Sequence, residues 1–174
     1  AAVEEYVSTG KVANMIAAMG WGQGELELIA RGTLQMDGMT KVDGDSLYRI
    51  YSMTKPITGM AVMMLIEDGK LTLDTPLSDI LPAYADMQVQ KQYDGSIGAD
   101  NLEPLRTPIT IRHLLTHTSG LGYGIVQKGP IKDAYEERGL IPGQVSRFPI
   151  PGVSRAKAVE GLATFADALA ELPL

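Results

Sequence analysis

The pattern of hydrophobic positions changes its period near residue 57. Before that point, apolar stretches at 12–19 and 26–30 flank a glycine-rich turn, and this arrangement predicts a β-hairpin. After it, apolar residues recur at i, i+3, i+4, i+7 and i+8 from Ile57, and this spacing predicts a helix that ends at Gly69. Because the positions between these are also apolar, we expect this helix to be buried on most sides.

The segments around this helix are less regular. Residues 1–8 can form a short helix, and residues 47–51 are expected to lead, extended, into Ser52. Further helices are expected at 75–81, capped by Thr75, at 111–116, capped by Thr110, near 131–138, and at 154–170, capped by Ser154. Residues 84–108 are expected to form a polar loop, and 120–152 to be mostly irregular.

Strands therefore come first along the chain, and helices follow. This order predicts an α/β (α+β) fold whose α/β layer begins but is not completed. We assign 1–70 to the N-terminal part of an α/β domain that includes the helix after Ser52. Residues 71–174 are assigned to a helical region.

Composition excludes several classes of function. With 45% hydrophobic and 21% charged residues, the chain has the composition of a globular protein. A net charge of -6 argues against nucleic acid or an anionic membrane as a partner, and no apolar run reaches the length of a membrane span. The lack of cysteine excludes disulfides and a thiol nucleophile and leaves the cellular compartment open. Since the chain begins at Ala1 rather than Met, we expect it to be trimmed or processed there.

A serine that starts a helix, with a lysine three residues later, can form a nucleophile and its proton partner, because the two side chains lie on one face. The spacing alone is weak evidence, since it occurs three times in this chain. Ser8 and Lys11 straddle Gly10 in a turn, which disfavours helical geometry. Ser154 and Lys157 open a charged first turn, where the serine is best explained as an N-cap and the lysine as a surface charge.

Ser52 and Lys55 differ because the helix that follows them is almost entirely apolar. A lysine in water has a pKa near 10.4, so a lysine that acts as a base near pH 7 needs that pKa lowered by roughly three units, about 4 kcal/mol. Desolvation is the main source of such a shift. We expect the apolar helix to desolvate Lys55 in part. The alternative, that Ser52 is only an N-cap and Lys55 extends into solvent, stays open on the tetrapeptide alone.

Other candidate sites are weaker. His113 and His117 are four residues apart, but Leu114 stands where a zinc protease would carry glutamate, and no third ligand is evident. We therefore expect a structural hydrogen-bonding role for these histidines, no metal site and no cofactor. The chain has no Gly-x-Ser-x-Gly elbow, which argues against an α/β-hydrolase.

Three separated segments resemble one superfamily, in the expected order. They are Leu47–Thr58, which contains Ser52-Met-Thr-Lys55, then Glu67–Leu77, and Thr110–Leu121, which contains His-Thr-Ser-Gly. Together they resemble the serine β-lactamases and penicillin-binding proteins, and within these most closely the class C β-lactamases and the family VIII carboxylesterases. The resemblance covers residues 10 to 125 and implies an antiparallel sheet flanked by helices, with an additional helical region.

The resemblance also implies a mechanism. Ser52 would attack a carbonyl and become acylated, Lys55 would take or relay its proton, and the Ser52 backbone N–H would be one oxyanion donor. Gly122 and Tyr123 would line the substrate cleft, although packing is an equally good explanation for Tyr123. The expected substrates are short-chain carboxylic esters. Alternatives are a β-lactam or D-alanyl peptide, and a non-catalytic binding relative.

Two elements of that family's pattern are missing from this chain. A Tyr-x-Asn or Tyr-x-Ser motif after the nucleophile is absent, since Tyr6-Val7-Ser8 precedes Ser52, and no Lys-Thr-Gly or His-x-Gly segment occurs. We therefore expect a C-terminal segment of the same protein to be the partner, as a second chain after a break near Leu174. Without it, the chain should be neither stable nor active, because its apolar faces lack a covering layer.

Overall fold

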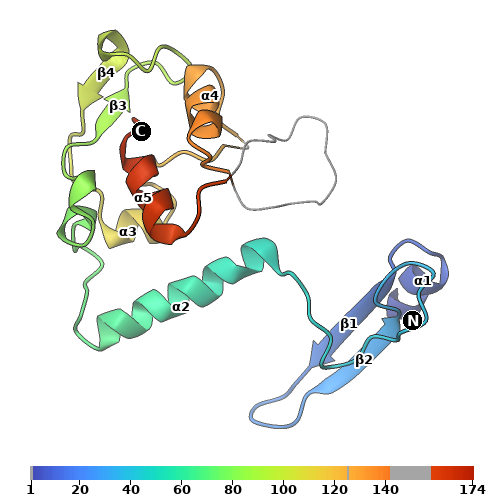
Figure 1. Cartoon of the computed structure of the whole chain (residues 1–174). Coiled ribbons are helices and arrows are strands. Elements are labelled where there is room, and N and C mark those ends of the chain that lie inside the picture. The colour runs from blue at the N-terminus through green and yellow to red at the C-terminus, as the bar shows by residue number, and fades with distance from the viewer. Residues whose placement is uncertain (1, 125, 142–157) are drawn as a thin grey trace. The chain divides into compact units, whose positions relative to one another are not determined.

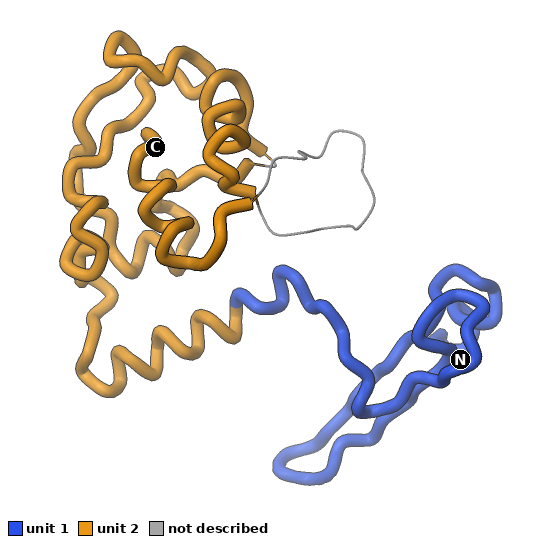
Figure 2. The backbone as a smooth tube through the Cα atoms, in the orientation of Figure 1, with its two compact units in different colours: residues 1–55 blue, residues 56–174 orange. Residues whose placement is uncertain are grey.

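The computed structural model describes residues 2–124, 126–141 and 158–174. The chain divides into two compact units, Ala1–Lys55 and Pro56–Leu174 (Figure 2). The predicted assignment of 1–70 and 71–174 to parts of two domains stays a prediction. In the described part of the chain, no helix combines the length and the apolar character needed to cross a membrane.

The first unit is built on the predicted hairpin. Strands β1 (Asn14–Met19) and β2 (Glu27–Gly32) pair antiparallel, with Asn14 opposite Gly32 and Met19 opposite Glu27 (Figure 1). Helix α1 (Ala2–Ser8) precedes them, as expected. Gly32 has a φ of +89°, and a Cβ there would collide with the backbone of Ala13, so glycine is required where β2 leaves the pair.

Helix α2 (Thr54–Glu67) follows a single 3₁₀ turn, η1 (Tyr51–Met53). It ends as the sequence predicts: Gly69 has a φ of +70°, its N–H donates to the Ile66 carbonyl, and the Lys70 N–H donates to the Leu65 carbonyl, both at 2.9 Å. These two bonds satisfy carbonyls that the end of a helix otherwise leaves without partners.

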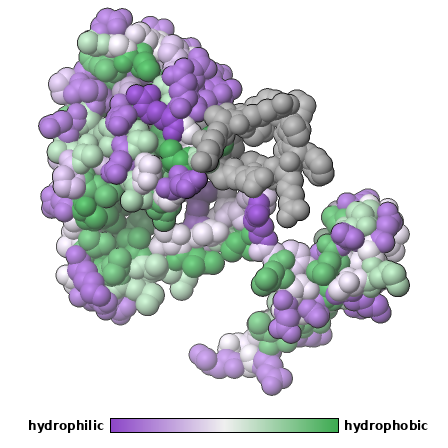
Figure 3. Space-filling model, in the orientation of Figure 1, coloured by the Kyte–Doolittle hydropathy of each residue, from purple (hydrophilic) through white to green (hydrophobic). Residues whose placement is uncertain are grey.

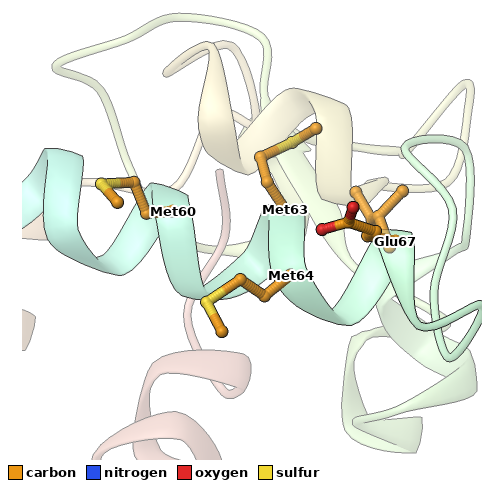
Figure 4. A pocket seen from close by; sticks show the side chains of 5 residues that line it. Met60, Met63, Met64 and Glu67 are labelled. Atoms are coloured by element: carbon orange, nitrogen blue, oxygen red, sulfur yellow. The ribbon is translucent and has the colours of Figure 1, made fainter.

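The prediction that this helix is buried is wrong for the described chain. No residue of α2 is buried, and Met60 and Met64 are 66% and 63% exposed. Figure 3 shows apolar surface on the second unit, to which most of α2 belongs. Three methionines, with Ile66 and Glu67, line a shallow hollow on α2, and Met63 and Met64 point to different sides of the helix (Figure 4). An apolar pattern of this kind normally indicates a buried helix, and the rest of the second unit does not bury α2.

The rest of the second unit has two small hydrophobic cores. The first, the Ile131 cluster, joins helix α4 (Pro130–Glu137) to the C-terminal residues; its members are Ile131, Ala134, Tyr135, Leu140 and Leu172. The second, the Leu77 cluster, consists of Leu77, Tyr84, Met87 and Ile109. Helix α5 (Leu162–Ala170) contributes residues to both, so it holds the two cores together.

The segment expected to be a loop, 84–108, contains a second hairpin. Strands β3 (Gln88–Gln90) and β4 (Leu102–Pro104) pair antiparallel, with short 3₁₀ helices η3 (Pro82–Tyr84) and η4 (Ala99–Asn101) beside them. Leu174 also bonds to this hairpin, donating to the Gln88 carbonyl and accepting from the Gln90 N–H, each at 2.8 Å. Strands this short carry little periodicity, so the pairing was not visible in the local pattern.

Helix α3 (Ile111–Leu115) forms where it was predicted, with Thr110 as its N-cap. The expected helix at 75–81 is instead a single 3₁₀ turn, η2 (Leu77–Asp79). Pro76 is extended (ψ 138°) and forms a bridge with Thr110, which prevents a helix from starting at Thr75.

Helix α5 begins later than the predicted start at Ser154. Residues 158–161 are not helical, and Gly161 precedes the helix with a φ of +86°. Ser154 and Lys157 lie outside the described residues, so their predicted capping and surface roles stay predictions.

Candidate active site

Ser52 and Lys55 lie next to each other at the start of α2. Ser52 is in the η1 turn and Lys55 in the first turn of the helix, and the Lys55 Nζ donates a hydrogen bond to the Ser52 Oγ at 2.8 Å. Both side chains are exposed. The spacing thus produces the predicted contact between a hydroxyl and an amine, while their catalytic roles stay a prediction.

The same spacing near the N-terminus gives a different arrangement. The Ser8 Oγ donates to the Glu5 carbonyl of its own helix at 3.4 Å, and the Lys11 Nζ lies over the Tyr6 ring, 4.8 Å from its centre. This hydroxyl and this amine each have a local structural partner, as the Gly10 turn led us to expect.

The residue before Ser52 has an unusual backbone conformation. Tyr51 has a φ of +45°, a left-handed conformation that is uncommon for a residue with a side chain. Residues 46–50 form no strand, and Ile50 is in the right-handed helical region, so the expected extended segment does not reach Ser52. Strain of this kind is of order 1–3 kcal/mol and is found preferentially at functional sites.

The two predicted substrate-binding residues lie in the loop after α3, in the second unit. Tyr123 is 50% exposed, and Gly122 is partly buried. The Gly122 N–H donates to the Oη of Tyr135, on α4, at 2.9 Å. Ser52 and Lys55 are therefore in contact in the first unit, and Gly122 and Tyr123 belong to the second.

Tyr135 was not identified from the sequence. Its spacing of four from Ile131 indicates only a core position on a helix. Burial raises the pKa of the Tyr135 hydroxyl above its ordinary value, and the hydrogen bonds from Gly122 and Gln127 act in the opposite direction. The hydroxyl is therefore neutral near pH 7 and available as a hydrogen-bonding group.

His113 has the structural role expected of it. Its Nδ1 accepts a hydrogen bond from the Thr110 backbone N–H at 3.1 Å, while the Thr110 side chain accepts from the His113 N–H, which completes a capping box. Among residues 2–124, 126–141 and 158–174, no three His, Asp or Glu side chains are grouped so that they could hold a metal ion.

Comparison with known proteins gives a consistent result. The family model described as Beta-lactamase matches residues 2–174. Protein Rv1367c of Mycobacterium tuberculosis is 35% identical over 136 residues, which are 78% of this chain and 33% of that protein. Esterase EstB of Burkholderia gladioli is 36% identical over 114 residues, which are 66% of this chain and 25% of that protein.

A solved structure shares the fold. EstCE1, described as a hydrolase with promiscuous acyltransferase activity, superimposes with a TM-score of 0.66 at 25% identity, over 99% of this chain and 38% of its own. The predicted β-lactamase-like fold class, α/β (α+β), is confirmed, with helices and small antiparallel sheets. The chain spans about a third or less of the length of these curated relatives.

Proposed function

The chain belongs to the β-lactamase family, and from that premise we propose that it is part of a serine enzyme that transfers acyl groups through Ser52. The proposal is carried by the 2.8 Å hydrogen bond between the Lys55 Nζ and the Ser52 Oγ at the start of a helix. As substrates we propose carboxylic esters with short acyl chains. This choice is supported by relatives named as an esterase and as a hydrolase with acyltransferase activity.

The proposed reaction has two halves. The Ser52 Oγ attacks the ester carbonyl carbon while its proton passes to a neutral Lys55 amine, and the Ser52 backbone N–H stabilises the negative charge on the carbonyl oxygen. The carbon–oxygen bond to the alcohol then breaks, and the alcohol leaves with the proton. Water, or a second alcohol, attacks the acyl-serine, and the carboxylic acid or a new ester is released.

A lysine that accepts a proton near pH 7 needs a site shielded from water. Among the described residues, Lys55 and most of α2 are exposed. We propose that further polypeptide, corresponding to the rest of the relatives' length, covers α2 and desolvates this lysine. We expect it to be a C-terminal segment of the same protein, which also supplies the tyrosine motif and a second oxyanion donor.

A fluorophosphonate ester tests the nucleophile directly, because it phosphonylates activated serines. In the full-length protein we expect one adduct, on Ser52, and none in Ser52→Ala. Ser8→Ala removes a serine that also stands three residues before a lysine, and this variant should label normally. An adduct on another serine would contradict the assignment. The intact mass of the labelled protein also tests the partner: a functional 18.7 kDa species with no companion polypeptide would contradict it.

β-Lactam hydrolysis is the second candidate, because the family model that matches carries that description. A β-lactam presents its carbonyl to the same nucleophile, so labelling cannot separate the two. Comparing kcat/KM for nitrocefin with that for p-nitrophenyl butyrate does so, and we expect the ester to be preferred. If Ser52→Ala left every activity unchanged, a non-catalytic binding role would replace both.

A further inference from the structure

We propose that Tyr135 is a positioning residue for the substrate loop, residues 121–124. Its hydroxyl holds the Gly122 amide and so fixes the direction in which the Tyr123 side chain projects from the core. This role rests on the proposed acyl-transfer function and on the expectation that Gly122 and Tyr123 contact its substrate.

The hydroxyl of Tyr135 is held in a fixed place. The residue is 2% exposed, and its ring packs in the Ile131 cluster. Its Oη accepts from the Gly122 N–H at 2.9 Å, and the Gln127 side chain bonds to the same hydroxyl. Tyrosine has only two side-chain torsions to restrain, so a buried ring presents its oxygen with little freedom. Gly122 and Gln127 therefore both bond to one buried oxygen.

The contact also explains why residue 122 is glycine. A Cβ at this position would collide with the side-chain amide of Gln127 and would lie 2.5 Å from the Tyr135 Oη and 2.9 Å from its Cζ, closer than real Cβ contacts. Gly122 is not among the residues with positive φ, so backbone conformation alone does not require glycine here. The requirement comes from the close approach of the Tyr135 hydroxyl and the Gln127 side chain to the loop backbone.

The loop is anchored at further points around Tyr123. Leu121 packs against the Leu77 cluster, so adjacent residues of the loop are held by the two separate cores of this unit. Beyond Tyr123, the Val126 carbonyl accepts from the Tyr93 hydroxyl at 3.2 Å. Tyr123 itself is half exposed. A side chain that projects from a backbone anchored on both sides can contact a substrate with reproducible geometry.

Tyr84 provides a matched comparison within the same unit. It is 4% exposed, and its hydroxyl donates at 2.8 Å to the Ala166 carbonyl of α5, away from the substrate loop. Its replacement by phenylalanine removes a buried tyrosine hydroxyl of the same kind. A purely structural role for Tyr135 therefore predicts the same consequences from both substitutions.

Tyr135→Phe in the full-length enzyme is the test. We expect hydrogen–deuterium exchange at the Gly122 amide, followed by mass spectrometry with fragmentation, to become roughly tenfold faster. On p-nitrophenyl esters from acetate to octanoate, KM should rise roughly three- to tenfold while kcat stays within about twofold, and the preference among chain lengths should weaken. Tyr84→Phe should change neither readout. Gly122→Ala should reproduce the Tyr135→Phe phenotype, because the added methyl displaces the hydroxyl.

The proposed role of Tyr135 and the proposed function can be contradicted separately. Unchanged exchange at Gly122, or faster exchange with unchanged KM and chain-length preference, in an enzyme that acylates at Ser52 would overturn the role of Tyr135 alone. Equal effects of Tyr135→Phe and Tyr84→Phe would also overturn it, since they would indicate general destabilisation. A full-length protein that is never phosphonylated at Ser52 would overturn the proposed function, and the role of Tyr135 with it.

Discussion

Ser52 and Lys55 show how much a three-residue spacing depends on its place in a helix. At the first turn of α2, the hydroxyl and the amine lie on one side and reach 2.8 Å. At the end of α1, the same spacing leaves Ser8 bonded to its own helix. The strained backbone of Tyr51, immediately before Ser52, distinguishes the first pair further.

Substitution of Lys55 tests its role as proton partner. We expect Lys55→Met to lower the single-turnover acylation rate by roughly 10²–10⁴-fold, the usual contribution of a positioned general base. Lys55→Arg should not restore it, because a guanidinium stays protonated in proteins. Lys11→Met serves as the control with the same spacing and should acylate normally. An acylation rate in Lys55→Met equal to that of the wild type would show that another group takes the proton.

The elements of the second unit are joined by contacts between distant residues. The Arg112 guanidinium, on α3, bonds both oxygens of Asp74 at 2.9 and 3.2 Å. Beside this pair, the Ile111 N–H donates to the Thr75 carbonyl at 3.1 Å. The segment before η2 is thus attached to α3 by one ion pair and by backbone bonds, so a short helix is held by its neighbours rather than by its own length.

The pair predicts an acid-dependent contribution to stability. The hydrogen bond from Arg112, with its charge, lowers the pKa of Asp74 below the ordinary value of 3.8. A lowered pKa means that the pair stabilises the fold above pH 3.8 and loses this effect as the pH falls through the lower folded value. The Tm difference between wild type and Asp74→Asn should therefore be largest near neutral pH and shrink on acidification.

Because both partners are exposed, this effect should be small and should weaken in 0.5 M salt. Asp86→Asn removes the same charge from the same unit and controls for net charge. A Tm difference for Asp74→Asn that grows on acidification would contradict the assignment of the stabilising form to the ionised carboxylate.

For the whole molecule, the main unmet requirement is a cover for α2. A helix that is apolar on all sides is normally buried, yet Met63 and Met64 are 48% and 63% exposed. The chain spans 38% of the EstCE1 chain that shares its fold. Both observations support the proposal that further polypeptide packs on α2.

Methionine truncations in the full-length protein test this cover. Met64→Ala should cost about 2–5 kcal/mol in the free energy of unfolding, as for a buried methionine, although this side chain is 63% exposed in the described residues. Met87→Ala, at a position that is already buried, should also cost about 2–5 kcal/mol. Urea unfolding followed by circular dichroism measures both values. A change of no more than about 0.5 kcal/mol for Met64→Ala, as expected of an exposed side chain, would contradict the cover.

The sequence by itself determined the features that depend on residues close along the chain. The β1–β2 hairpin, the helix after Ser52 with its Gly69 end, and the Thr110 cap were all predictable. So was the contact between Ser52 and Lys55. In each case the partners are few residues apart or joined by one turn, so local periodicity, capping and glycine conformations carry the information.

Only the tertiary structure decided the features that join distant residues. The pairing of β3 with β4, the bridge that keeps Pro76 extended, and the bond between Gly122 and Tyr135 left no local pattern. The exposure of α2 was decided in the same way. Hydrophobic periodicity indicates that a helix has a face to bury, but it does not indicate which segment covers that face. Burial and hydrogen bonding between separate elements depend on which surfaces meet, and that is settled only when the chain packs.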